Sequence, residues 1–99
     1  AWALILSELV PEKSNAILAR GRAFAQSRAV CNVHWQSDIL NGSVLGAAAY
    51  SKLHSSALFL TTLERAKAEI EKNKGKEQSK VVKSRGECEQ EAEALAMLY

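Results

Sequence analysis

The chain has 99 residues, with 13 Lys and Arg against 11 Asp and Glu, and so carries a formal net charge of +2. That charge is too small to indicate binding to nucleic acid or to an acidic membrane surface, and no apolar run is long enough to span a bilayer. The length suits one small domain or part of a larger one. The apolar opening stretch lacks a basic leader and reaches Glu8 early, so we do not expect it to be a signal peptide.

Two helices are predicted in the first third of the chain. The first, over 1–10, has apolar residues at helical spacing and ends at Pro11, because proline cannot continue a helix. Its expected core residues are Trp2, Ile5, Leu6 and Leu9. The second is predicted over 11–31. Gly21 costs this helix about 1 kcal/mol relative to alanine, which suggests a close contact with a neighbouring helix at that point.

Two further helices are predicted over 37–54 and 56–74. A connection over 32–35 precedes them, in which Asn32 suits the left-handed backbone that closes a helix. Small residues on the third helix, including Gly42 and Gly46, allow close packing on a neighbour. His54, in that helix's last turn, is interpreted as a cationic residue that favours the helix dipole rather than as a metal ligand.

The chain is therefore predicted to be all-α, a bundle of about four helices within a larger all-α fold. Residues 1–74 form the domain, and 75–99 are predicted to be a polar linker and tail with room for a short helix over 87–99. Cys31 and Cys88 allow one disulfide but do not require it. Cys31 is interpreted as a small buried apolar residue.

One motif contains residues suited to phosphoryl transfer. Ser27, Arg28, His34 and Asp38 follow the spacing S-R-x5-H-x3-D. Arg grips phosphate with two parallel donors, His attacks phosphorus through an unprotonated ring nitrogen, and Asp holds the opposite ring N–H. Three of the four also have an ordinary structural role. Arg28 favours a helix C-terminus, Asp38 or Ser37 suits an N-cap, and the Ser27 hydroxyl suits either phosphate or helix packing.

The stretch Gln26-Ser-Arg28, together with His34-Trp-Gln-Ser-Asp38, resembles the class A bacterial non-specific acid phosphatases. Their superfamily also holds the membrane phosphatidic acid phosphatases and the vanadium haloperoxidases. The resemblance runs from residue 1 to about residue 72. It implies that Arg28 contacts phosphate, that His34 becomes a phosphohistidine and that Asp38 orients His34. It further implies phosphate monoester substrates, no metal or other cofactor, and a periplasmic setting.

Two other motifs of that family, K-x6-R-P and P-S-G-H, do not occur in this sequence. The first grips phosphate, and the His of the second protonates the leaving group. We interpret the chain as the C-terminal half of such an enzyme. Since each oxyanion donor is worth roughly 10²–10³ in rate, we expect the chain alone to be nearly inactive. The sequence leaves open whether the chain pairs with a separate N-terminal half or with further copies of itself.

Two alternatives to the phosphatase hypothesis are considered. One is a vanadate-dependent haloperoxidase. The resemblance implies that such an enzyme would hold vanadate with the same three residues, Arg28, His34 and Asp38. The other is a non-catalytic helical interaction module, which is favoured by Asn32, where the family usually has Gly, and by the tail, to which the resemblance does not extend.

Overall fold

The structure, a computed structural model, describes residues 1–74, 76 and 85–97. Within these ranges every regular element is helical, which confirms the predicted all-α class. The elements are α1 (Trp2–Leu9), the short 3-10 helix η1 (Pro11–Lys13), α2 (Ser14–Val30), α3 (Gln36–Leu53), α4 (Ala57–Asn73) and α5 (Arg85–Met97). Most of the predicted linker, 75–84, lies outside the described residues.

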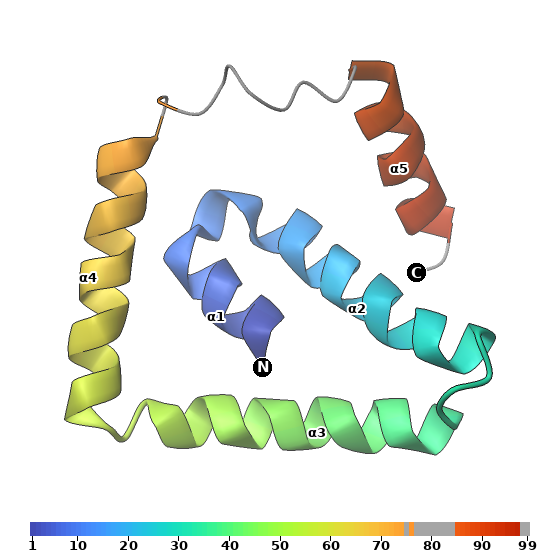
Figure 1. Ribbon diagram of the computed structural model, residues 1–99, viewed down its shortest axis with the longest axis horizontal. Coiled ribbons are helices and arrows are strands. Elements are labelled where there is room, and N and C mark those ends of the chain that lie inside the picture. The colour runs from blue at the N-terminus through green and yellow to red at the C-terminus, as the bar shows by residue number, and fades with distance from the viewer. Residues whose placement is uncertain (75, 77–84, 98–99) are drawn as a thin grey trace.

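Figure 1 shows α3 and α4 as two sides of an open frame, with α1 inside it and α2 crossing beside α1. Contacts join α1 to α2, α3 and α4. α1 is thus the element around which the other three are arranged. No helix of the described part of the chain combines the length and the apolar character needed to cross a membrane.

Two glycines set how closely α1 approaches its neighbours. A Cβ atom built on Gly21 would lie 2.8 Å from the Cβ of Ala3, so this glycine is what lets α1 and α2 touch, as predicted. A Cβ built on Gly46 would lie 3.0 Å from the backbone nitrogen of Ala1, which brings the start of α1 against α3. Gly42 has no atom within 4 Å of such a Cβ, so only part of the predicted small-residue face is used.

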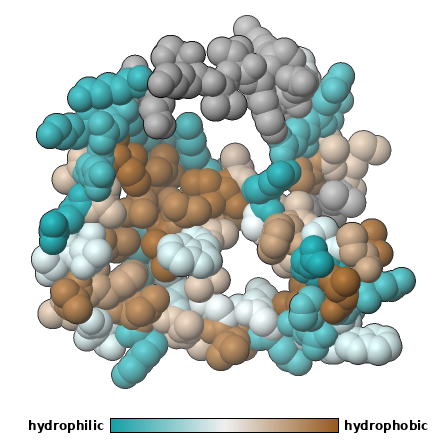
Figure 2. All heavy atoms as spheres, viewed as in Figure 1, coloured by the Kyte–Doolittle hydropathy of each residue, from teal (hydrophilic) through white to brown (hydrophobic). Residues whose placement is uncertain are grey.

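The apolar core is much smaller than predicted. Of the described residues, only Leu9 and Leu63 are buried, at 8% and 7% exposure. Trp2, which was expected in the core, is 77% exposed, and Leu6 is 44% exposed. Figure 2 shows apolar residues gathered around α1, with hollows between the helices. The three α-helices that contact α1 do not surround it, so the arrangement is more open than the predicted bundle.

A polar cluster joins α1 to the end of α3. Glu8 Oε2 accepts a hydrogen bond from the Tyr50 hydroxyl at 2.6 Å and lies 2.8 Å from His54 Nε2. The His54 ring also lies against the rings of Tyr50 and Phe59, with centroids 4.4 and 5.2 Å away. His54 caps the C-terminus of α3, as its predicted position in the last turn requires, but it also holds α1 through Glu8.

Candidate active site

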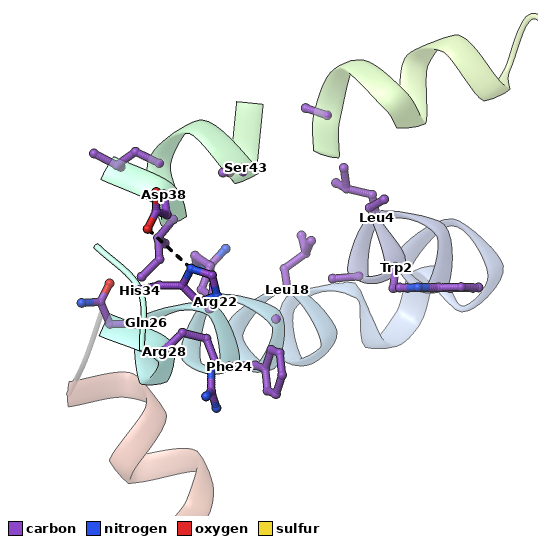
Figure 3. Close-up of a pocket in the computed structure, with 18 of the residues that line it drawn as sticks. Trp2, Leu4, Leu18, Arg22, Phe24, Gln26, Arg28, His34, Asp38 and Ser43 are labelled. Carbon is purple, nitrogen blue, oxygen red and sulfur yellow. Dashed lines mark ion pairs between the residues drawn. The ribbon is translucent and has the colours of Figure 1, made fainter. Parts of the chain in front are cut away.

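An open groove of about 810 Å³ lies between α1, α2 and α3. Three of the four predicted site residues, Arg28, His34 and Asp38, line it. Figure 3 shows them at one end of the groove, with the apolar side chains of Trp2, Leu4 and Leu18 toward the other. The fourth predicted residue, Ser27, is not among the lining residues.

The turn before α3 determines where His34 lies. α2 ends at Val30, and Asn32 takes the predicted left-handed conformation with φ 57°. The backbone N–H groups of Val33 and His34 both donate to the carbonyl oxygen of Arg28, at 3.1 and 3.2 Å. The last turn of α2 thus fixes the backbone that presents the His34 imidazole.

His34 and Asp38 meet as the spacing predicts. Asp38 Oδ2 lies 3.5 Å from His34 Nδ1, which leaves Nε2 as the ring nitrogen without that partner. The same carboxylate oxygen accepts a hydrogen bond from the backbone N–H of Trp35 at 2.8 Å. Both side chains are about half exposed, so water reaches the pair freely.

Asp38 also stabilises the start of α3, although it is not the N-cap residue. The N-cap residue is Trp35 rather than Ser37 or Asp38, and Asp38 caps from the third helical position by reaching back to the Trp35 N–H. A carboxylate in a first helical turn also complements the helix dipole. The two roles predicted for Asp38, a partner of His34 and a helix-capping group, therefore occur together.

Arg28 shares the groove but does not point at His34. Figure 3 shows its guanidinium directed away from the His34–Asp38 pair. Within the described part of the chain, the Arg28 side chain forms no hydrogen bond or ion pair. The expected approach of Arg28 to the second ring nitrogen of His34 is therefore not seen.

The Ser27 hydroxyl donates to the carbonyl oxygen of Phe24, one turn back on α2, at 2.6 Å. This bond lies within α2 and joins Ser27 to no other helix. Its alternative role as a phosphate donor remains a prediction, and it would require the hydroxyl to leave this bond.

Sequence reasoning missed four polar residues of the groove: Arg22, Gln26, Gln36 and Ser43. Arg22 and Gln26 are four residues apart on α2, so helical spacing places them on one face. Gln26 and Gln36 bond to each other through their side-chain amides, at 3.0 and 3.3 Å. The i,i+4 spacing was a usable signal for the first pair, but no spacing rule predicts a contact across a turn.

Cys31, at the end of α2, is an exposed free thiol, which corrects its interpretation as a buried apolar residue. It is the C-cap residue of α2, in the turn that follows the helix. The side chain of Cys88 lies outside the described residues.

Curated relatives of the chain are bacterial phosphatases. It is 43% identical over 74 residues to a non-specific acid phosphatase of Providencia stuartii, and 43% identical over 70 residues to an acid phosphatase of Zymomonas mobilis. A non-specific acid phosphatase of Salmonella typhimurium is 39% identical over 68 residues. The chain is homologous to bacterial non-specific acid phosphatases.

This homology agrees with the resemblance predicted from the S-R-x5-H-x3-D motif. The matches cover 69–75% of this chain but only 26–30% of the acid phosphatases themselves, so the chain spans less than a third of their length. No protein-family model matches the chain, and no solved structure matches it.

Proposed function

We propose that the chain carries one part of the catalytic site of an acid phosphatase that hydrolyses phosphate monoesters, with His34 as the nucleophile. The observation that supports this most directly is the 3.5 Å approach of Asp38 Oδ2 to His34 Nδ1. The homologues, which are named acid phosphatases, give the reaction class.

The contact between Asp38 and His34 Nδ1 supports a separate task for each ring nitrogen of His34. With the proton on Nδ1 facing Asp38, the Nε2 lone pair is free to attack phosphorus. The N–P bond forms as the P–O ester bond breaks, and the leaving oxygen takes a proton from a general acid. Water then breaks the N–P bond, which releases inorganic phosphate and restores His34. Asp38 stabilises the positive charge that the imidazole carries in between.

The phosphate oxygens need cationic donors, and the groove offers Arg28 and Arg22. Arg28 has to rotate from the direction seen in Figure 3 to reach a phosphate on His34. Arg28 is only partly buried, so its long side chain can rotate, and catalytic contacts are often looser without substrate. We infer that phosphate binding draws the Arg28 guanidinium toward His34.

The proposal also covers what this chain lacks. The general acid and the other phosphate donors belong, by the resemblance, to the K-x6-R-P and P-S-G-H motifs, which do not occur here. We therefore infer that the chain alone turns over phosphate monoesters very slowly and that a polypeptide carrying those motifs completes the site. A periplasmic setting is part of the same proposal, and cell fractionation tests it.

Orthovanadate, a phosphate analogue, tests the binding half of the proposal. Isotope-labelled chain is titrated with orthovanadate while the His34 ring resonances are followed by NMR. We expect a saturable shift that Arg28→Ala weakens. Arg65→Ala, an exposed arginine on α4 outside the groove, is the matched control and should bind as the unaltered chain does.

Hydrolysis of p-nitrophenyl phosphate tests the catalytic half. The chain is assayed alone and after co-expression with the part of the Providencia stuartii enzyme that has no counterpart in it. We expect very low activity alone, a rise on co-expression, and loss of that rise with His34→Ala. Activity that survives His34→Ala would overturn the proposal, and so would a failure to bind orthovanadate.

A non-catalytic module is the second candidate, and the direction of Arg28 is the observation that favours it. Such a module would not bind orthovanadate in an Arg28-dependent way. The same titration therefore separates the two functions.

A further inference from the structure

The side chains of Gln26 and Gln36 form a reciprocal amide pair across the turn that carries His34. Gln26 Nε2 donates to Gln36 Oε1 at 3.0 Å, and Gln36 Nε2 donates to Gln26 Oε1 at 3.3 Å. Gln26 is on α2, two residues before Arg28, and Gln36 is the first residue of α3. The pair therefore joins the end of one helix to the start of the next.

The two glutamines flank the turn that holds His34, the candidate nucleophile. His34 lies two residues before Gln36, and its backbone N–H is held from the α2 side by the Arg28 carbonyl at 3.2 Å. From the α3 side, Trp35 N–H is held by Asp38 Oδ2 at 2.8 Å. The turn is thus held by a hydrogen bond at each end, and the amide pair joins the two helices that flank it.

We propose that Gln26 and Gln36 are positioning residues that hold the His34 turn so that its ring meets the phosphate-binding groove. The inference rests on the proposed function of His34. Both glutamines line the groove, and their carboxamides engage each other, so we assign them an indirect action through His34.

The chemistry of the pair suits this role. Two carboxamides that bond reciprocally each offer a donor and an acceptor, so the pair has one preferred geometry and no net charge. A salt bridge at the same place would put a carboxylate beside a groove meant for an anion. A neutral pair restrains the turn without repelling phosphate.

Methionine substitutions test the pair, because Met keeps the length and lack of charge of Gln but removes the amide. The variants are Gln26→Met, Gln36→Met and the double variant, in the full chain. Gln90→Met, at an exposed glutamine on α5, is the matched control. The measurements are orthovanadate affinity, read at the His34 ring, the midpoint of thermal unfolding, and hydrogen exchange at the His34 and Trp35 amides.

Positioning predicts that each single variant loses about fivefold in orthovanadate affinity, and that the double variant loses no more than either single one. Hydrogen exchange at the His34 and Trp35 amides should be faster in both single variants and in the double variant. The midpoints of thermal unfolding of these variants should be no lower than that of Gln90→Met. Unchanged affinity would overturn the inference. Losses that multiply in the double variant would also overturn it, because they would indicate that each amide contacts the ligand independently.

This test separates the pair from the function on which it rests. If the unaltered chain bound no orthovanadate, the proposed function would fail, and the amide exchange would still decide whether the pair holds the turn. Unchanged exchange in the double variant would then reject the positioning role. Lower unfolding midpoints with unchanged exchange at the turn would assign the pair to general stability instead.

Discussion

His54 Nε2 lies 2.8 Å from Glu8 Oε2, and this contact joins the end of α3 to α1 across 46 residues of sequence. The other ring nitrogen, Nδ1, lies 2.8 Å from the carbonyl oxygen of Tyr50. Both partners are acceptors, so only the doubly protonated imidazolium donates to both. The Tyr50 carbonyl, and then Glu8, raise the pKa of His54 above its ordinary value of 6.5.

The Glu8 carboxylate is affected in the opposite direction. The Tyr50 hydroxyl, followed by His54, holds the pKa of Glu8 below its ordinary value of 4.5, and Lys67 on α4 adds a smaller effect of the same sign. The ionised forms of both groups are therefore the ones that the folded chain prefers.

The stability of the fold should accordingly depend on pH through this pair. A raised His54 pKa contributes stability that is complete below pH 6.5 and is lost as pH rises through the pKa of the folded state. A lowered Glu8 pKa contributes stability that is complete above pH 4.5 and is lost as pH falls through its folded pKa. The contribution of the pair is therefore greatest between about pH 4.5 and 6.5.

Thermal unfolding of the chain and of His54→Gln, followed by circular dichroism from pH 4 to 9, checks this. The unaltered chain should lose stability relative to His54→Gln as pH rises above 6.5. Lys52→Gln removes an exposed charge near the same helix end and should leave the shape of the profile unchanged. Parallel profiles for the chain and His54→Gln would contradict the expectation.

The Tyr50 hydroxyl can be removed without disturbing the rings around it. Tyr50→Phe keeps the ring that lies 4.4 Å from His54 but leaves Glu8 without its 2.6 Å donor. Hydrogen bonds to a charged group are worth more than neutral ones, and partial exposure reduces that value. We expect a loss of about 1 kcal/mol in the free energy of unfolding, measured with urea at pH 6. No change would mean that water replaces the hydroxyl fully.

Two glycine variants should shift stability in opposite directions. Gly42→Ala meets nothing within 4 Å, so it should stabilise α3 by up to about 1 kcal/mol through helix propensity alone. Gly21→Ala gains the same propensity, but its new Cβ would lie 2.8 Å from the Ala3 Cβ and push α1 from α2. We expect a net loss of about 1 kcal/mol, since overpacking typically costs more than the propensity gained. Urea unfolding of both variants measures the difference, and a stabilised Gly21→Ala would show that α1 moves freely.

The helices could be predicted from local signals, because their ends depend on residues close in sequence. Pro11 ends α1, and Asn32 closes the turn after α2 with the expected left-handed backbone. The S-R-x5-H-x3-D spacing likewise predicted the approach of His34 and Asp38, which are four residues apart across the start of α3.

Whether the apolar face of a helix is buried could not be predicted from local signals. Periodicity shows which face of a helix is apolar, but burial depends on how many neighbours cover it. Trp2 lies on such a face and is 77% exposed. The direction of Arg28 and the contact between Glu8 and His54 depend on how separate helices pack, and this information does not lie in any local pattern.

The two buried leucines make the small core testable with a matched pair on one helix. Leu63 is 7% exposed and Leu58 is 78% exposed, and both belong to α4. Leu63→Ala removes packed atoms and leaves a cavity, but the open arrangement lets neighbours relax, so we expect about 2 kcal/mol of destabilisation, the low end for such changes. Leu58→Ala should stay within about 0.5 kcal/mol of the unaltered chain. Equal effects at the two positions, measured by urea unfolding, would mean that the surface of α4 that carries Leu58 is covered in solution, for example by a second copy of the chain.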